Sequence, residues 1–245
     1  MPRIIRSFVH DVRATMIGDE ISLPHEESHH LSKVLRLEPE ASMEVLNGMG
    51  DRFQVQCLEV NSKSIRIRID SIERCPLVLP LIRVAVSLIK GKKWDDLIRP
   101  LTELGAHRIT PLITDRTEVR YDPLKFKSKM LKWNRNAMEA CKQSGNPWLP
   151  KLDEPISFSN FLSENQEKER RFLASLSSTV SCFTGEDQAN DHLALLIGPE
   201  GGWSGKEEAL AEKMGVEGFS LGSNVLRVET AAVSALTVAK ASFLP

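Results

Sequence analysis

The stretch that decides the fold reads LALLIGPEGGWSGKEEAL and spans residues 193–210. Its first part is an apolar run, which is typical of a strand buried on both faces of a parallel sheet. The run ends at Gly198-Pro199, passes an acid and two glycines, and opens into a charged stretch with helical character. Ser204 followed by Glu207 predicts a capping box at the start of that helix. The stretch therefore predicts a strand, a loop with few side chains, and a helix.

A second loop of the same kind follows near the C-terminus, in LGSNVLRVETA at residues 221–231. Gly222 predicts a turn after an apolar strand, and the last helix is expected to begin at about Glu229. Glycine lets the backbone approach a ligand closely. Ligands of α/β sheets bind beyond the carboxyl ends of the strands. We therefore expect both loops to border one site.

Apolar strands alternate with helices over residues 75–245, which predicts an α/β domain with a mainly parallel sheet. We expect strands at 81–89, 107–114, 170–177, 192–198 and 216–222, and helices at 92–106, at 123–144, from about 204 and from about 229. Polar residues are common over 157–190, which predicts a surface segment with variable loops.

The first 74 residues predict a small, mostly β barrel with one helix. Two extended runs at 43–60 surround Asn47-Gly48, a pair that favours a tight turn. Residues 63–72 alternate apolar and polar side chains, as a strand with one wet face does. A helix is expected within 23–39, and the two prolines of residues 74–80 predict a linker.

Composition excludes several classes of protein. The chain has 245 residues, 41% hydrophobic and 27% charged, as in ordinary soluble proteins. No apolar run approaches the roughly 20 residues that cross a bilayer, and no signal peptide is recognisable, so a cytoplasmic location is expected. The four cysteines form no C-x-x-C pair. His25, His29 and His30 lack a second group of ligands, so no metal site is expected.

Charge is unevenly distributed along a chain whose net charge is only −1. Residues 76–150 contain 14 basic and 7 acidic residues, while the flanking segments are acidic. This distribution favours a localised anionic partner. A solvated lysine-rich helix around Lys125–Lys132 explains it equally well.

The first loop matches neither the dinucleotide nor the P-loop pattern, which argues against a nucleoside triphosphate. On spacing alone, a strand end with a helix cap accounts for it. Arg227 in the second loop is costly to bury among apolar neighbours without a partner. Either it forms an ion pair with Glu229 or Glu200, or it faces an anion or a developing negative charge.

Together, LIGPEGGWSGKE and LGSNVLRVETAAVSAL resemble the paired C-terminal motifs of the SPOUT methyltransferases, most closely the RsmE family. HHLSKVLRL, KGKKWDDLIRPLTELGAHRITPLITDRTEV and NAMEACKQSG resemble further signatures of that family. Trp148-Leu149 departs from its pattern. The resemblance implies a PUA-like RNA-binding domain at 1–74 and a SPOUT α/β domain with a trefoil knot at 75–245. It also implies a homodimer with its active site at the subunit interface.

The resemblance further implies methylation of uracil N3 in 16S ribosomal RNA with S-adenosylmethionine as cofactor. Carried over to this chain, the cofactor-binding residues are Leu173, Leu196, Gly198, Pro199, Gly201, Gly202, Leu221, Gly222, Asn224, Val225 and Leu226. Uracil N3 is a poor nucleophile until its proton leaves, and a nearby cation would lower its pKa. This chemistry makes Arg227 the expected stabiliser of the anion, with Glu229 or Glu200 as proton acceptor or orienting group.

The target base must be unpaired to be reached, so RNA contacts are required. Candidate RNA-binding residues are Arg3, Arg6, His29, Arg36, Lys90, Lys92, Lys93, Arg116 and Arg120. Two other functions stay open on the sequence: ribose 2′-O-methylation of RNA, and RNA binding without catalysis in ribosome assembly.

Overall fold

The computed structural model describes residues 4–10, 12, 16–91, 93–119, 122–164, 169–176 and 191–243. The chain divides into two compact units, one of residues 1–77 with 138–149 and one of residues 78–137 with 150–245. The sequence does not indicate that residues 138–149 belong with the first unit. No helix of the described part is long and apolar enough to cross a membrane.

The first unit contains a mixed five-stranded sheet in the order β1-β3-β4-β5-β2. Its strands are β1 (Arg6–Phe8), β2 (Glu20–Ser22), β3 (Ser42–Leu46), β4 (Asp51–Val60) and β5 (Ile65–Arg74). β1 pairs with β3 in parallel, and the other pairings are antiparallel. The predicted turn between β3 and β4 is confirmed, with the Asn47 side chain accepting a hydrogen bond from Met49 N at 2.8 Å.

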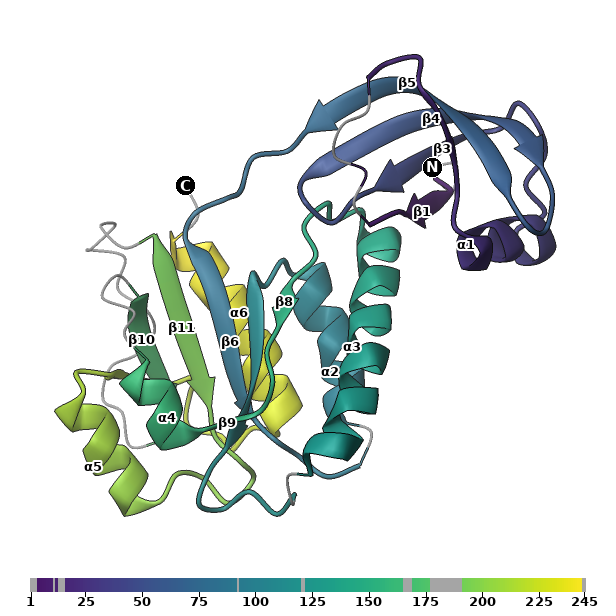
Figure 1. The fold of residues 1–245 in the computed structure, drawn as a ribbon. Coiled ribbons are helices and arrows are strands. Elements are labelled where there is room, and N and C mark those ends of the chain that lie inside the picture. The colour runs from purple at the N-terminus through teal and green to yellow at the C-terminus, as the bar shows by residue number, and fades with distance from the viewer. Residues whose placement is uncertain are drawn as a thin grey trace. The chain divides into compact units, whose positions relative to one another are not determined.

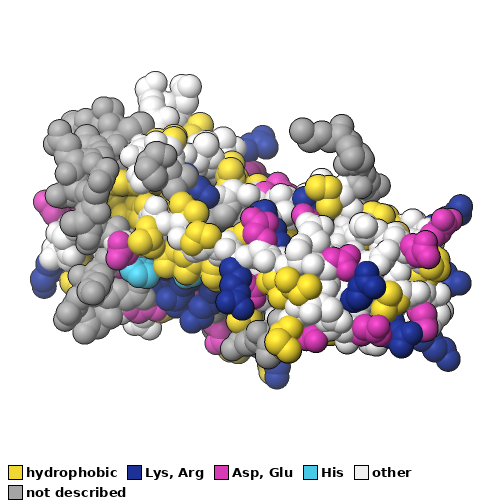
Figure 2. All heavy atoms as spheres, turned by 90° about the horizontal axis from the view of Figure 1, so that it is seen from above, with side chains coloured by type: hydrophobic (Ala, Val, Ile, Leu, Met, Phe, Trp, Pro, Cys, Tyr) yellow, Lys and Arg dark blue, Asp and Glu magenta, His cyan; other side chains and the backbone are white. Residues whose placement is uncertain are grey.

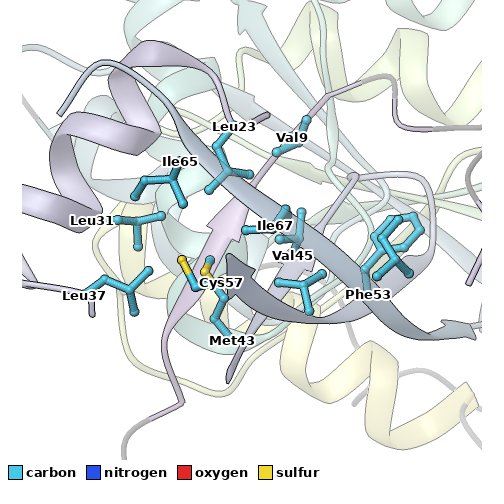
Figure 3. Packing of buried hydrophobic residues seen from close by; sticks show 12 residues of the cluster. Val9, Leu23, Leu31, Leu37, Met43, Val45, Phe53, Cys57, Ile65 and Ile67 are labelled. Atoms are coloured by element: carbon cyan, nitrogen blue, oxygen red, sulfur yellow. The ribbon is translucent and has the colours of Figure 1, made fainter. Parts of the chain in front are cut away.

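Alternate residues of these strands build the core of the first unit (Figure 3). Ile65, Ile67 and Ile69 are fully buried, whereas the arginines between them are exposed. The period-two pattern of this strand is therefore confirmed. Burying a side chain of this size contributes roughly 1.5–3 kcal/mol.

The helix expected within residues 23–39 is short and changes type. α1 (His25–His29) continues directly into the π-helix η1 (His30–Val34). Leu31 is fully buried and holds the segment on the sheet. The segment ends near Arg36, whose φ of 52° is left-handed.

Trp148, the departure from the family pattern, has a packing role in the first unit. Its ring lies against Gly50, where an added Cβ would be 2.4 Å from a ring carbon. Met49 forms a β-bridge with Trp148, and Arg52 donates to the Gly145 carbonyl at 2.9 Å. These contacts join residues 138–149 to the β3–β4 hairpin.

The second unit contains a sheet in which every described pairing is parallel, in the order β12-β10-β11-β6-β7-β8, with β9 also paired to β7. The strands are β6 (Leu81–Ser87), β7 (Arg108–Ile113), β8 (Lys151–Leu152), β9 (Ile156–Ser157), β10 (Glu169–Ala174), β11 (His192–Ile197) and β12 (Glu217–Phe219). The helices are α2 (Lys93–Glu103), α4 (Phe158–Ser163), α5 (Gly205–Lys213), α6 (Val228–Phe243) and the part of α3 (Pro123–Ser144) that precedes residue 138. The predicted α/β class and the parallel sheet are confirmed.

Helices cover both faces of this sheet (Figure 1). α6 packs on β6, β11 and α2. On the other face, Phe158 and Phe161 of α4 join a hydrophobic cluster with Trp203 and the strands. The short elements β8, β9 and α4 were not predicted, because two-residue strands and a six-residue helix carry too little periodic pattern.

A buried arginine on the central strand β6 organises the side chains near the amino ends of the strands. Arg83 is only 3% exposed and donates to Thr110 at 2.7 Å and to Glu164 at 2.6 Å. It also lies 3.3 Å from Asp153 and 4.3 Å from the centre of the Phe161 ring. A buried cation requires such partners, because its desolvation is otherwise uncompensated.

We predict that Arg83→Leu lowers the free energy of unfolding by about 3–5 kcal/mol, because the acidic side chains lose their buried partner. Urea denaturation measures the change. Arg99→Leu on α2 is the matched control, since Arg99 is exposed, and it should stay within about 0.5 kcal/mol of wild type. Equal stabilities for both variants would contradict a stabilising role for the Arg83 network.

Candidate functional site

A cavity of about 460 Å³ lies in the second unit at the carboxyl ends of β10, β11 and β12. Three loops and the first turns of α6 form its wall. The lining residues are Ala174, Ser175, Leu176, Ile197, Gly198, Pro199, Glu200, Gly201, Gly202, Trp203, Glu208, Leu221, Gly222, Asn224, Val225, Leu226, Val228 and Ala231. The two glycine loops singled out in the sequence therefore meet in one place.

Most of the expected cofactor-binding residues line this cavity. Leu173 and Leu196 do not, because both are buried in the hydrophobic cluster beneath it. Ala174, Ser175 and Leu176 take the place of Leu173 at the end of β10. The sequence indicates where β10 ends. It does not indicate which of the last side chains face the core and which face the cavity.

Trp203 explains why residue 198 is glycine. An added Cβ at Gly198 would lie 3.0 Å from an indole carbon of Trp203, which is closer than side chains normally approach. The indole Nε1 donates to the Ala174 carbonyl at 2.8 Å, and the ring packs 4.9 Å from Phe158. Trp203 thus joins the loop after β10 to the loop after β11. Sequence reasoning missed this residue, although a bulky aromatic side chain after two glycines was a visible signal.

Backbone conformation explains two other glycines. Gly202 has a φ of +69° and Gly222 a φ of +115°, values that residues with a Cβ rarely adopt. The Gly202 amide closes a turn onto the Pro199 carbonyl at 2.8 Å. The predicted capping box of Ser204 and Glu207 is confirmed at the start of α5.

Arg227 is exposed, and its side chain makes no ion pair within the described residues. Of the two alternatives that the sequence left open for Arg227, the ion pair with Glu229 or Glu200 is therefore not formed within the described residues. Instead, Lys93 Nζ lies 3.6 Å from Glu200 Oε1 and 4.0 Å from Glu229 Oε1. Exposure to water leaves Arg227 without the desolvation cost that would demand a partner.

Glu200 and Glu229 occupy different positions around α6. Glu200 lines the cavity and is 55% exposed. Glu229 borders a second hollow between α2 and α6, and its buried Oε2 atom accepts no hydrogen bond from the described residues. Lys93 lies near both carboxylates and keeps their negative charges partly compensated.

The candidate RNA-binding residues fall into three groups. Arg3, Lys92 and Arg120 lie outside the described residues. His29, Arg36, Lys90 and Lys93 are exposed. Lys90 forms an ion pair with Glu118, and this hydrogen bond lowers the pKa of the Glu118 carboxyl.

Arg6 and Arg116 make contacts within the protein. Arg6 is 18% exposed at its side chain, lies 2.5 Å from Glu44 and donates to the Lys142 carbonyl at 3.3 Å. Arg116 donates to the Gly201 carbonyl at 2.6 Å. Within the described residues, no group of three potential metal ligands occurs.

Residues 78–240 match the family model of the RNA methyltransferase domain. The chain is 31% identical over 225 residues to the ribosomal RNA small subunit methyltransferase E of Synechocystis sp., covering 90% of this chain and 73% of that protein. The chain belongs to this family, the RsmE family.

A second sequence relative and a solved structure support the same assignment. The ribosomal RNA small subunit methyltransferase E of Bacillus subtilis is 30% identical over 227 residues, covering 88% of each chain. A Legionella pneumophila protein solved in complex with the cofactor SAM superposes with a TM-score of 0.88, at 32% identity and 98% coverage of both chains. The RsmE fold thus extends over both units of the chain.

We predict that Gly198→Ala lowers the free energy of unfolding by about 1–3 kcal/mol, because the new methyl group overpacks against Trp203. Gly205→Ala is the matched control, since nothing lies within 4 Å of its Cβ position at the start of α5. That control should be neutral or stabilising by up to about 1 kcal/mol. Urea denaturation distinguishes the two; an undiminished stability of Gly198→Ala would contradict the packing role of Trp203.

Proposed function

We propose that this RsmE-family protein transfers a methyl group from S-adenosylmethionine to a uridine of small-subunit ribosomal RNA. The observation that carries the proposal is the cavity formed by the three loops at one edge of the parallel sheet. The relatives' names support methylation of small-subunit ribosomal RNA, and the Legionella protein's bound SAM supports the cofactor.

The charge and shape of the cavity suit S-adenosylmethionine better than a phosphate-rich ligand. Glu200 and Glu208 line the cavity, and its described lining contains no lysine or arginine. Carboxylates favour a cationic sulfonium and ammonium and repel phosphates. Val225 and Leu226 offer an apolar surface for a flat base, and the glycine loops let backbone groups approach the ligand.

When bound, S-adenosylmethionine supplies an activated methyl group, so the protein needs no metal and no covalent intermediate. The chain must align the acceptor and exclude water from the reacting atoms. Uracil N3 also has to lose a proton, which spreads charge onto the flanking carbonyl oxygens. The proposed stabiliser of that charge is the exposed guanidinium of Arg227, which is adjacent in sequence to Leu226 and Val228 of the cavity wall.

Glu229 and Glu200 are the proposed proton acceptor or orienting groups. Oε2 of Glu229 accepts no hydrogen bond from the described residues, which supports its role as the acceptor. The ammonium group of Lys93 lies 4.0 Å from the other oxygen, Oε1. We propose further that His29, Arg36, Lys90 and Lys93, together with Arg3, Lys92 and Arg120, contact RNA phosphates. Splaying out the target base costs a few kcal/mol, which these contacts have to supply.

Three features of the family complete the proposal: RNA binding by a PUA-like domain at 1–74, a trefoil knot in the SPOUT domain at 75–245, and a homodimer. Each stays a prediction. A dimeric mass by light scattering at working concentration is the expected result for the third, and a monomer would contradict it.

We predict that Arg227→Ala lowers kcat by about 10²–10³-fold at pH 7, the usual cost of losing one donor to a developing anion. The defect should shrink as pH rises, because the imide proton then leaves without help. S-adenosylmethionine affinity should stay unchanged, since the Arg227 side chain does not line the cavity. Arg135→Ala, an exposed arginine on α3, is the control. A pH-independent defect, or none, would contradict the proposed role.

The direct test compares small-subunit ribosomal RNA from cells with and without the gene. We expect one base-methylated uridine to disappear on deletion, as read by mass spectrometry of digested nucleosides. Loss of a ribose-methylated nucleoside would favour the 2′-O-methyltransferase alternative. An absence of S-adenosylmethionine binding in calorimetry by the folded wild type would favour the non-catalytic alternative.

A further inference from the structure

We infer that Asp115, Arg116, Ser204 and Glu207, here called the loop junction, fix the Gly198–Trp203 loop in its cofactor-binding shape. The inference rests on the proposed function, because it assigns S-adenosylmethionine to the cavity that this loop lines. It makes Arg116 and Glu207 positioning residues of the reaction. The sequence alone had indicated an RNA contact for Arg116 and only a helix cap for Glu207.

The centre of the loop junction is a buried carboxylate. Glu207 is only 5% exposed, and its two oxygens accept from backbone amides of different loops. Oε2 accepts from Ser204 N at 2.8 Å, as in an ordinary capping box, whereas Oε1 accepts from Asp115 N at 2.9 Å. A helix cap needs only the first of these bonds. The second ties the loop after β7 to the start of α5.

Two further contacts connect the same loops. Ser204 Oγ donates to Asp115 Oδ2 at 2.5 Å. This bond joins a side chain at the start of α5 to a side chain of the loop after β7. Arg116 Nη1 donates to the Gly201 carbonyl at 2.6 Å. The Arg116 stem also lies over Gly201, where an added Cβ would be 3.3 Å from Arg116 Cδ. Gly201 is part of the cavity wall, so this bond acts directly on the cofactor loop.

Hydrogen bonds within the loop after β7, and between this loop and β6, fix the loop near its start. Thr114 N donates to Thr117 Oγ1 at 2.9 Å, which closes the loop on itself. The Ser87 hydroxyl at the end of β6 lies 2.9 Å from the Thr117 hydroxyl and 3.2 Å from that of Thr114. The loop after β7 is thus hydrogen bonded to the end of β6, and the loop junction connects it to the Gly198–Trp203 loop.

Arg116 does not line the cavity, and its guanidinium is engaged by a backbone carbonyl rather than by an acid. A role through position predicts that the variant loses cofactor affinity in the absence of RNA. A role as an RNA contact predicts weaker RNA binding with unchanged cofactor affinity. The two roles therefore separate in a binding experiment without catalysis.

The experiment uses the full chain and four variants: Arg116→Ala, Arg116→Lys, Glu207→Gln and the control Arg135→Ala. Calorimetry measures S-adenosylmethionine affinity without RNA, and hydrogen–deuterium exchange follows the peptide over 198–204 in ligand-free protein. Arg116→Ala should weaken affinity about tenfold and speed exchange in that peptide, because one charged hydrogen bond is lost. Arg116→Lys should recover part of the affinity, and Arg135→Ala should match wild type.

Unchanged cofactor affinity and unchanged exchange in Arg116→Ala, with a wild type that binds S-adenosylmethionine, would overturn the inference. A loss of RNA affinity alone would assign Arg116 to RNA contact instead. If the wild type does not bind S-adenosylmethionine, the proposed function is wrong. Hydrogen–deuterium exchange over residues 198–204 in Arg116→Ala and wild type then still shows whether the loop junction fixes the loop. Should Glu207→Gln fail to fold, Arg116→Ala carries the test by itself.

Discussion

The packing of Trp203 against Gly198 is the contact on which the cavity depends. The indole is 7% exposed and belongs to the hydrophobic cluster under the sheet, yet one side of it forms the cavity wall. Its Nε1 hydrogen bond to Ala174 uses the polar edge that a buried tryptophan must satisfy. One side chain therefore sets the spacing of two loops. At Gly198 and Gly201 the space that a Cβ would occupy is filled by Trp203 and Arg116, respectively.

The net charge of a sequence segment does not show which of its charged side chains are paired, because their partners come from other segments of the fold. Part of the basic excess of residues 76–150 is compensated by acidic side chains from other segments of the same unit. Arg83 and Arg108 pair with Asp153, which lies outside that segment, and Lys142 pairs with Glu27. On the face drawn in Figure 2, basic and acidic side chains are interspersed.

Long, strongly patterned elements could be predicted from the sequence, and so could the loops that end them. The apolar strands at the centre of the second sheet and the alternating strand of Ile65, Ile67 and Ile69 carry clear periods. What the sequence did not indicate depends on contacts between residues distant in sequence. Whether Leu173 faces the core or the cavity is a matter of one residue of register. The exposure of Arg227 and the proximity of Lys93 to Glu200 arise only when three separate segments meet.

The two glycine loops differ in how firmly the protein holds them. The Gly198–Trp203 loop is bound by Trp203 below and by the loop junction at its side. In the 221–227 loop, Val225 is 78% exposed, and the side chains of Asn224 and Arg227 hydrogen bond to no other described residue. A loop that is already fixed lowers the entropic cost of ligand binding. An exposed apolar surface contributes favourable free energy only when a ligand buries it. The cavity therefore combines one half whose loop is held by protein contacts with another half whose apolar wall is exposed. Arg227 follows directly on that exposed half in the sequence, and its own side chain lies outside the cavity lining.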